Sequence, residues 1–369
     1  MDAALREALE GFELSGEFAD AVEIKTGHIN RTVCVTCRQT DGSTRNYILQ
    51  CINTYAFKRP EQVMENVTRV TEHLRASMLA RGENPANRVL QVIPARTGGV
   101  LFRDGIGNCW RAYDYISGAV SHDRVEHPDQ FQEIGRAFGE FQRMLSDFPI
   151  ERLYETIPDF HNTKKRLKAF EDSVLRDVAH HARMVKADID FVRARRREMG
   201  RIVEMIEQGH LPLRVTHNDT KINNVMLDAV TGRALCVIDL DTVMAGSVLY
   251  DFGDAIRYGA STAAEDEADL SKISLDLDLF KAFARGFIGE TAKDLTRCEL
   301  ENLPLGAMVM TFEVGLRFLT DYLDGDCLLY TSEEAIMNAI RQAREMLAGD
   351  VVGRIRDGLS GLEATAHVE

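Results

Sequence analysis

The stretch that decides the fold is VTHNDTKINNVML, which occupies residues 215–227. Its polar positions follow the spacing HxDxxxxN, formed by His217, Asp219 and Asn224. Carboxylate and carboxamide oxygens are the ligands that a hard cation such as Mg²⁺ takes in proteins. So short a motif also occurs by chance in unrelated sequences, and its meaning therefore depends on the residues that follow it.

Two short apolar runs, 225–227 and 234–238, follow the motif and are separated by a turn. Folding these strands back on each other places Asn224 beside Asp239, to within a residue or two of register. An amide oxygen and a carboxylate would then face one small volume, which suits Mg²⁺. Asp241 lies on the same strand face and is a candidate for a second contact or an orienting group.

The spacing of the motif is also that of the protein-kinase catalytic loop. In that loop the aspartate meets the hydroxyl group of the acceptor, and the asparagine holds a metal ion. Asp219 is therefore the candidate catalytic base, Asn224 and Asp239 are the candidate metal ligands, and the implied reaction is phosphoryl transfer. The alternative interpretation is structural, with Asp219 and Asn224 capping a turn and Asp239 ending a strand.

The tripeptide DFG at residues 251–253 spells the metal-binding motif of protein kinases, but the expected hairpin argues against that role. Asp251 lies twelve residues beyond Asp239 in the sequence. We therefore assign the metal to Asp239. Asp251 and Asp254 are expected to be first-turn acids or N-caps of the helix that follows.

Length and composition are those of a globular protein with an acidic surface. The 369 residues suffice for two domains or lobes, and 44 basic against 58 acidic residues give a net charge of −14. That charge argues against nucleic acids and anionic membranes as partners. The N-terminus lacks a signal-peptide pattern, no apolar stretch looks long enough to span a bilayer, and seven cysteines are scattered. We expect a cytoplasmic protein.

The first third of the chain predicts a small antiparallel sheet. A helix is expected over residues 1–20, strands over 22–37, 47–52 and 109–116, and a second helix over 60–81. This is the order of elements in the small lobe of a kinase. In such a lobe the first turn covers the phosphates, and a hinge after the last strand meets the adenine.

The nucleotide-binding candidates follow from this comparison and are Gly27 and Asn30 in the first turn, Gln50 on the third strand, and Asp114, Tyr115 and Ile116 in the hinge. A protein kinase has a lysine where Gln50 stands, and an amide carries no charge. The phosphates would then depend on Mg²⁺ or on another base such as Arg45 or Lys58. A nucleotide-binding protein without catalytic activity therefore stays an alternative.

Beyond the hinge, helices are expected over 128–148, 163–175, 189–206, 277–289, 303–323 and 332–347. The predicted fold class is α+β, a protein-kinase-like bilobal fold. Its N-terminal lobe, 1–117, holds the small antiparallel sheet, and its C-terminal lobe, 118–369, is mostly helical. The basic cluster at 164–166 is expected to be a solvated surface.

One of these helices carries Glu313, Arg317 and Asp321 at positions i, i+4 and i+8. The three side chains form either a row of charges paired with one another or a surface that hydrogen-bonds the hydroxyl groups of a sugar. The residues alone leave both interpretations open.

Three segments resemble the phosphotransferase family that includes the aminoglycoside and choline kinases. They are HNDTK at 217–221, IDLDT at 238–242 and DFGDAIR at 251–257. Within that family the resemblance extends over most of the chain to the kinases of N-acetylhexosamines. It implies ATP- and Mg²⁺-dependent phosphorylation of the anomeric hydroxyl of N-acetylglucosamine or N-acetylgalactosamine.

The resemblance also implies roles for particular residues. Asp219 would be the base, with Asn224 and Asp239 as metal ligands, and Gln50 in place of the lysine agrees with these relatives. Four more residues match positions around the sugar or phosphate of the relatives, namely His28, Lys221, Glu313 and Arg317. Two alternatives stay open, which are a kinase of the same fold for choline, homoserine or an aminoglycoside, and a non-catalytic nucleotide-binding protein.

Overall fold

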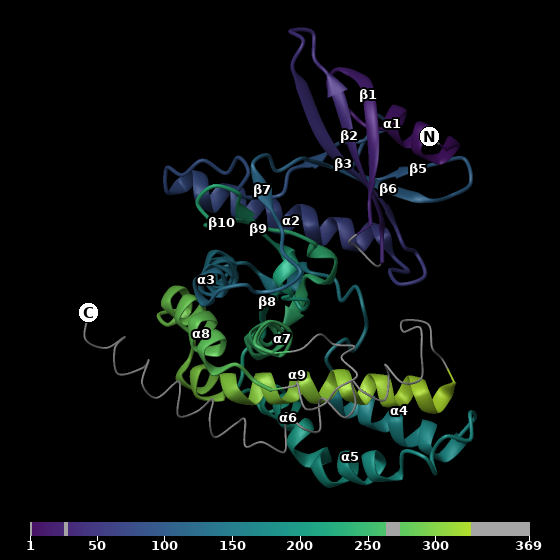
Figure 1. Ribbon diagram of the computed structural model, residues 1–369, viewed down its shortest axis with the longest axis vertical. Helices are drawn as coiled ribbons and strands as arrows, with labels where there is room; N and C mark the ends of the chain where they lie inside the picture. Colours follow the sequence, from purple (N-terminus) through teal and green to yellow (C-terminus); the bar gives the residue numbers. More distant parts are fainter. Residues whose placement is uncertain (1, 26–28, 263–273, 326–369) are drawn as a thin grey trace. The chain divides into compact units, whose positions relative to one another are not determined.

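The computed structural model describes residues 2–25, 29–262 and 274–325 (Figure 1). The chain divides into two compact units, each assembled from separate stretches of sequence. The first unit comprises Met1–Val120, Asp147–Ile157 and Met226–Met244, and the second comprises Ser121–Ser146, Pro158–Val225 and Ala245–Glu369. The two lobes expected from the sequence, 1–117 and 118–369, stay a prediction.

The first unit is built on an antiparallel sheet with strand order β1-β2-β3-β6-β4, in which β5 also pairs with β6. Its elements are α1 (Ala3–Gly11), β1 (Glu17–Ile24), β2 (Arg31–Arg38), β3 (Thr44–Ile52), α2 (Pro60–Ala80), β4 (Val92–Ile93), β5 (Phe102–Arg103) and β6 (Cys109–Asp114). Alternate residues such as Val35, Leu49 and Trp110 point to one face and pack with α1 in a shared core. The antiparallel sheet and the long second helix expected from the sequence are confirmed.

The helix expected over residues 1–20 is wrong in its second half. The observed helix α1 ends at Gly11, and the chain enters the edge strand β1 at Glu17. Gly16 between them has φ +90°, a left-handed conformation that favours glycine and turns the chain into the sheet. Phe18, which lies within the expected helix, is 42% exposed on β1.

The expected hairpin is present and belongs to a small second sheet. Its strands are β9 (Val225–Asp228) and β10 (Ala234–Val237), and β7 (Ala119–Val120) pairs antiparallel with β9. Three short helical turns complete the connections, namely η1 (Ile150–Arg152), η2 (Ile222–Asn224) and η3 (Leu240–Thr242). Asn224 therefore directly precedes the first hairpin strand, and Asp239 follows the second.

The second unit is mostly helical, as expected. Its helices are α3 (Pro128–Met144), α4 (Thr163–Arg176), α5 (Lys186–Met199), α6 (Arg201–Glu207), α7 (Val248–Gly259), α8 (Leu277–Thr291) and α9 (Arg297–Asp324), and β8 (Arg214–Thr216) pairs with β11 (Met244–Gly246). The single helix expected over 189–206 is broken at Gly200 into α5 and α6. The helix expected over 332–347 lies outside the described residues.

Helix α9, the long yellow-green helix in Figure 1, packs against α4, α5, α6 and α7. By length and composition alone it could cross a membrane, so the expectation that no apolar stretch is long enough was wrong. Its most apolar window has a mean hydropathy of 1.3 and is 78% buried within the protein. The apolar residues of α9 are those of a core helix, because neighbouring helices cover most of its sides.

Helices α7 and α9 cross at a contact that only glycine allows. A Cβ atom on Gly253 would overlap the backbone oxygen of Gly306, and one on Gly306 would overlap the backbone oxygen of Leu249. The close approach brings the backbones of the two helices together. Since α7 also carries Asp251 and Asp254, this crossing fixes the position of both acids within the unit.

Gly306→Ala is expected to lower the free energy of unfolding by roughly 2 kcal/mol, because a methyl group overpacks the crossing. Gly289→Ala on α8 is the matched control, since nothing lies within 4 Å of a Cβ atom there. Alanine is favoured over glycine in a helix by about 0.5–1 kcal/mol, so the control should gain stability. Urea denaturation measures both changes in the free energy of unfolding. Equal stabilities of the two variants would show that the contact between α7 and α9 does not require glycine at position 306.

Candidate active site

The HxDxxxxN motif forms a loop between β8 and η2 in the second unit. His217 and Asn218 are buried, whereas the side chain of Asp219 is 29% exposed. Asn218 has φ +63°, a left-handed conformation that asparagine tolerates better than most residues. After the sharp turn at Asn218, the carboxylate of Asp219 is partly exposed between buried neighbours.

Two buried acids of α7 hold the backbone of this loop. The carboxylate of Asp251 accepts hydrogen bonds from the backbone N–H groups of His217, at 2.9 Å, and Asn218, at 2.7 Å. Gln142 donates a third bond to it at 2.6 Å. Asp254 accepts the backbone N–H of Thr220 at 3.0 Å. Three of the loop's N–H groups are therefore bound by side chains of one helix.

This arrangement corrects the role expected for Asp251 and Asp254. The N-cap of α7 is Ser247, whose hydroxyl accepts the backbone N–H of Leu249. Asp251 lies in the first turn, as expected, but it binds the loop rather than the end of its own helix. Asp254 lies beyond the first turn and also accepts two bonds from Arg257, at 3.0 and 2.8 Å.

The two acids differ in what opposes the effect of burial. Burial raises the pKa of Asp251, and the electrostatic interaction with His217, followed by the hydrogen bonds from His217, Asn218 and Gln142, acts against that rise. Burial also opposes ionisation of Asp254, but Arg257 and Lys221 outweigh it and lower its pKa. Both sites offer N–H donors, which suit an ionised carboxylate.

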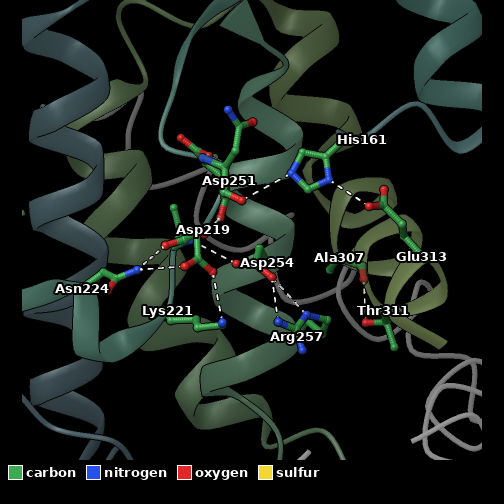
Figure 2. Close-up of polar contacts among 12 residues, drawn as sticks. His161, Asp219, Lys221, Asn224, Asp251, Asp254, Arg257, Ala307, Thr311 and Glu313 are labelled. Atoms are coloured by element: carbon green, nitrogen blue, oxygen red, sulfur yellow. Dashed lines mark hydrogen bonds and ion pairs between the residues drawn. The ribbon is translucent and has the colours of Figure 1, made fainter. Parts of the chain in front are cut away.

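Asp219, Lys221 and Asn224 lie together, as Figure 2 shows. The side-chain nitrogen of Asn224 donates to the backbone oxygen of Asp219 at 2.8 Å and to its Oδ2 at 3.2 Å. Lys221 Nζ is 3.3 Å from Asp219 Oδ1. Both bonds of Asn224 use its nitrogen, and its Oδ1 accepts no hydrogen bond from the described residues. That oxygen is therefore positioned to serve as a ligand for a cation.

A second group of charges surrounds Glu313, which is 1% exposed (Figure 2). His161 Nδ1 lies 3.0 Å from Glu313 Oε1, and Arg166 Nε lies 3.1 Å from the same atom. The other ring nitrogen of His161 lies 3.3 Å from the backbone oxygen of Asn218. Glu313 is thereby connected through one imidazole to the loop that carries Asp219.

These contacts answer part of the question left open by the sequence. Glu313 takes its partners from outside α9, so the row of three charges is not simply paired with itself. Burial opposes ionisation of Glu313, but His161, Arg166 and Arg317 outweigh it and hold its pKa below the ordinary value. The expectation that 164–166 is a solvated cluster was wrong for Arg166, whose side chain is only 24% exposed.

The candidates in the first unit converge on a residue that the sequence analysis missed. Arg111 on β6 donates to Gln50 Oε1 at 2.9 Å and makes two hydrogen bonds to the carboxylate of Asp241. Asn30 donates to the same carboxylate at 2.8 Å. The signal in the sequence was an arginine within CWRAYD, a strand whose first five residues are all buried. Gly27 and His28 lie outside the described residues.

Arg45 and Lys58 were proposed to supply the positive charge that Gln50 lacks, and neither contacts Gln50 in a hydrogen bond or ion pair given for the described residues. Arg45 pairs with the side chain of Asp114 at 2.7 Å, and Lys58 is exposed. In the hinge, the N–H of Asp114 donates to Gln91 at 2.9 Å, and the N–H of Tyr115 donates to Asn46 at 3.3 Å. The N–H of Ile116 makes no hydrogen bond to another described residue.

The structure thus brings together Asp219, Lys221 and Asn224 in the second unit, and Asn30 with Gln50 in the first. Asp239 belongs to the first unit and is exposed. It has φ +57° and ψ +59°, directly before η3. Because Asn224 and Asp239 belong to different units, their shared role as metal ligands stays a prediction.

Comparison with known proteins gives one family and several similar folds. The model of a family described as "Phosphotransferase enzyme family" matches residues 20–282. An aminoglycoside phosphotransferase from Alicyclobacillus acidocaldarius has a TM-score of 0.63 at 11% identity, over 98% of this chain and 96% of that chain. Amicoumacin kinase hAmiN, in complex with AMP-PNP, Ca²⁺ and Ami, has a TM-score of 0.59 at 13% identity, over 94% and 93%. A microcompartment-associated aminopropanol kinase has a TM-score of 0.55 at 16% identity, over 92% and 93%.

At these identities the similar structures bear on the fold alone. They confirm the expected kinase-like fold, with an antiparallel sheet in the N-terminal region and a helical C-terminal region. They do not identify the molecule that accepts the phosphoryl group.

Asp251→Asn is expected to loosen the loop, because an amide can accept on only one oxygen and so leaves a buried N–H of the loop without a partner. Such a group costs about 1–3 kcal/mol. Hydrogen exchange should report faster exchange of the amides of His217 and Asn218. Asp228→Asn is the control, since Asp228 also accepts two backbone N–H groups but lies on an exposed turn. Unchanged protection of the His217 and Asn218 amides in Asp251→Asn would show that the Asp251 carboxylate does not hold the loop.

A pH dependence follows from Glu313, whose folded-state pKa lies below its ordinary value of 4.5. Such a carboxylate stabilises the fold above its unfolded pKa, and the contribution is lost as pH falls through the folded pKa. The wild type should therefore lose more thermal stability than Glu313→Gln on acidification from neutral pH to about pH 3. Parallel curves of melting temperature against pH would show that the surrounding cations do not stabilise this charge.

Proposed function

Because the chain belongs to the phosphotransferase enzyme family, we propose that it is an ATP- and Mg²⁺-dependent kinase that phosphorylates the anomeric hydroxyl of N-acetylhexosamines. One observation carries the proposal. Asp219 is partly exposed beside Lys221 and Asn224 in a loop whose backbone is bound by buried acids. This is the arrangement that presents a carboxylate to an acceptor hydroxyl group while restricting its movement.

Asp219 is the proposed base. An anomeric hydroxyl group is more acidic than the other hydroxyl groups of a sugar, so Asp219 need only orient it and accept its proton late in the transfer. Lys221, 3.3 Å from Asp219 Oδ1, keeps positive charge beside the carboxylate and beside any phosphate brought to it. The chain thus supplies orientation and electrostatic stabilisation, which are most of what phosphoryl transfer needs from a protein.

Asn224 and Asp239 are the proposed Mg²⁺ ligands. The donor chemistry fits, because the Asn224 oxygen is left open by bonds that use only its nitrogen, and Asp239 adds an exposed carboxylate. When bound, the metal would neutralise charge on the nucleotide phosphates. The kinase of similar fold that binds AMP-PNP and Ca²⁺ supports a nucleotide and a divalent cation here.

The nucleotide is proposed to lie along the residues of the first unit, namely Gly27, Asn30 and Gln50 near the phosphates and Asp114, Tyr115 and Ile116 near the base. In the hinge, Ile116 is the residue whose N–H is not used by another described residue. The side chains of Asn30 and Gln50 are both hydrogen-bonded to buried partners, which supports a fixed rather than a flexible phosphate-facing segment.

The acceptor is proposed to meet Lys221, Glu313 and Arg317, with His28 from the first turn. Glu313 is connected through His161 to the loop that carries Asp219, which supports a role for Glu313 near the proposed base. Two of these four side chains, Lys221 and Arg317, are basic, which suits hydroxyl and carbonyl groups better than a cationic acceptor. The net charge of −14 supports a small molecule rather than a nucleic acid as the substrate. We also propose that the protein is cytoplasmic.

Asp219→Asn is expected to lower turnover by roughly 10²–10⁴-fold, because the base is lost while the loop keeps its fold. Nucleotide affinity, measured by fluorescence with a labelled ATP, should stay close to that of the wild type. Asp147→Asn is the control, since its side chain is 82% exposed and, among the described residues, pairs with His73 alone. Turnover retained by Asp219→Asn would eliminate the proposed role.

An acceptor panel with ADP release as the readout tests the choice of substrate. N-acetylglucosamine and N-acetylgalactosamine should support release and give a phosphate that mild acid removes. ADP release with choline, homoserine or an aminoglycoside instead, giving an acid-stable ester, would support kinase activity. It would contradict the proposal that the acceptor is an N-acetylhexosamine. ATP binding without release for any acceptor would indicate a non-catalytic nucleotide-binding protein.

A further inference from the structure

A buried ion pair lies at the centre of the first unit. Arg111 on β6 and Asp241 in η3 are 1% and 4% exposed, and the guanidinium meets both oxygens of the carboxylate. A charge so deeply buried is stable only when it is paired and hydrogen-bonded. Burial opposes the charge on Arg111, but Asp241 above all, with Asp239 as a smaller contributor, raises its pKa above the ordinary value.

Arg111 cannot itself bind a phosphate in this arrangement. Its Nε donates to Gln50, and its two terminal nitrogens are directed at Asp241. The guanidinium also lies 5.3 Å from the ring of Tyr113 and contacts the sulfur of Met64 at 3.7 Å. Every side of the group is occupied by protein, so its effect must pass through the residues it holds.

Asp241 joins four segments that are far apart in the sequence. Its carboxylate accepts Arg111 from β6 and Asn30 from the first turn, and its backbone oxygen accepts the hydroxyl of Thr156 at 3.3 Å. Through Arg111 it also reaches Gln50 on β3. Asn30 is itself fixed, because its Oδ1 accepts the backbone N–H of Asn53 at 2.9 Å.

Asp239 stands two residues before this junction, in a left-handed conformation. Aspartate tolerates that conformation better than most residues, and the neighbouring contacts hold it there. The fixed position of Asp241 and the turn η3, closed by a bond from Val243 N to Leu240 O, hold the chain immediately after Asp239. The same ion pair therefore sets the backbone from which the proposed metal ligand projects.

We propose that Arg111 is the positioning residue of this kinase, and that its ion pair with Asp241 fixes the segment bearing Asp239 against Asn30 and Gln50. Arg111 acts on the nucleotide only through the residues that it holds, because its guanidinium is already bonded to Gln50 and Asp241. The inference rests on the proposed function for the metal and the nucleotide, whereas the ion pair itself does not.

Arginine is required for geometric reasons. A planar guanidinium offers two parallel N–H groups to a carboxylate and a third to Gln50, and an ammonium group cannot make all three bonds in fixed directions. Arg111→Lys keeps the charge but loses this geometry. It is therefore a sharper test than removal of the charge, which risks unfolding the sheet.

The test measures Mn²⁺ affinity by electron paramagnetic resonance with AMP-PNP bound, for wild type, Arg111→Lys and Asp241→Asn. Each variant should bind Mn²⁺ about tenfold more weakly, as changes behind a metal ligand commonly do. Binding of metal-free ATP should hold, and the KM for Mg²⁺ should rise more than kcat falls. Arg193→Lys is the control, because Arg193 makes an ion pair with Glu171 through two of its guanidinium nitrogens, on an exposed helix surface.

Hydrogen exchange gives a second measurement that does not depend on activity. The amide of Val243, which closes η3, should lose protection in Arg111→Lys and keep it in Arg193→Lys. Wild-type Mn²⁺ affinity in folded Arg111→Lys and Asp241→Asn would overturn the inference and leave the proposed function standing. An equal loss of metal-free ATP binding would also overturn it, since Arg111 would then act on the nucleotide directly. A wild type that binds no Mn²⁺ with AMP-PNP would overturn the proposed function and the inference together, whatever the exchange data show.

Discussion

The carboxylate of Asp251 is the contact on which the rest of the site depends. It binds the backbone N–H groups of His217 and Asn218 from below the loop, in a fully buried position. With both groups held, Asn218 keeps a left-handed backbone and the next residue, Asp219, is partly exposed. The sequence DFG at 251–253 therefore has a structural task in this chain, although it spells the metal-binding motif of protein kinases.

A similar arrangement occurs in the first unit, where the buried acid Asp241 fixes a segment that carries the exposed acid Asp239. Asp251 is buried and Asp219 is partly exposed, and likewise Asp241 is buried two residues from the exposed Asp239. Each buried acid has its own donors, backbone N–H groups in one case and Arg111 in the other. A chain with a net charge of −14 thus keeps several carboxylates inside, where they order the backbone rather than repel one another.

Local patterns in the sequence predicted the parts of the fold that depend on neighbours in the chain. The hairpin after Asn224 and most helices follow from periodicity and turn chemistry, and the helix expected over 1–20 failed where Gly16 turns the chain. The long-range partners could not be read in this way. Arg111 and Asp241 are 130 residues apart, and His161 and Glu313 are 152 apart. Asp251 was assigned to its own helix because two of its three partners are backbone N–H groups, which leave no trace in residue types, and the third, Gln142, is 109 residues away.

The most direct test of this account is the anomalous signal of Mn²⁺ in a crystal grown with AMP-PNP. The account requires one peak coordinated by the side-chain oxygen of Asn224 and the carboxylate of Asp239, with Asp251 still bound to the backbone of His217 and Asn218. A peak coordinated by Asp251, or one remote from both Asn224 and Asp239, would contradict it.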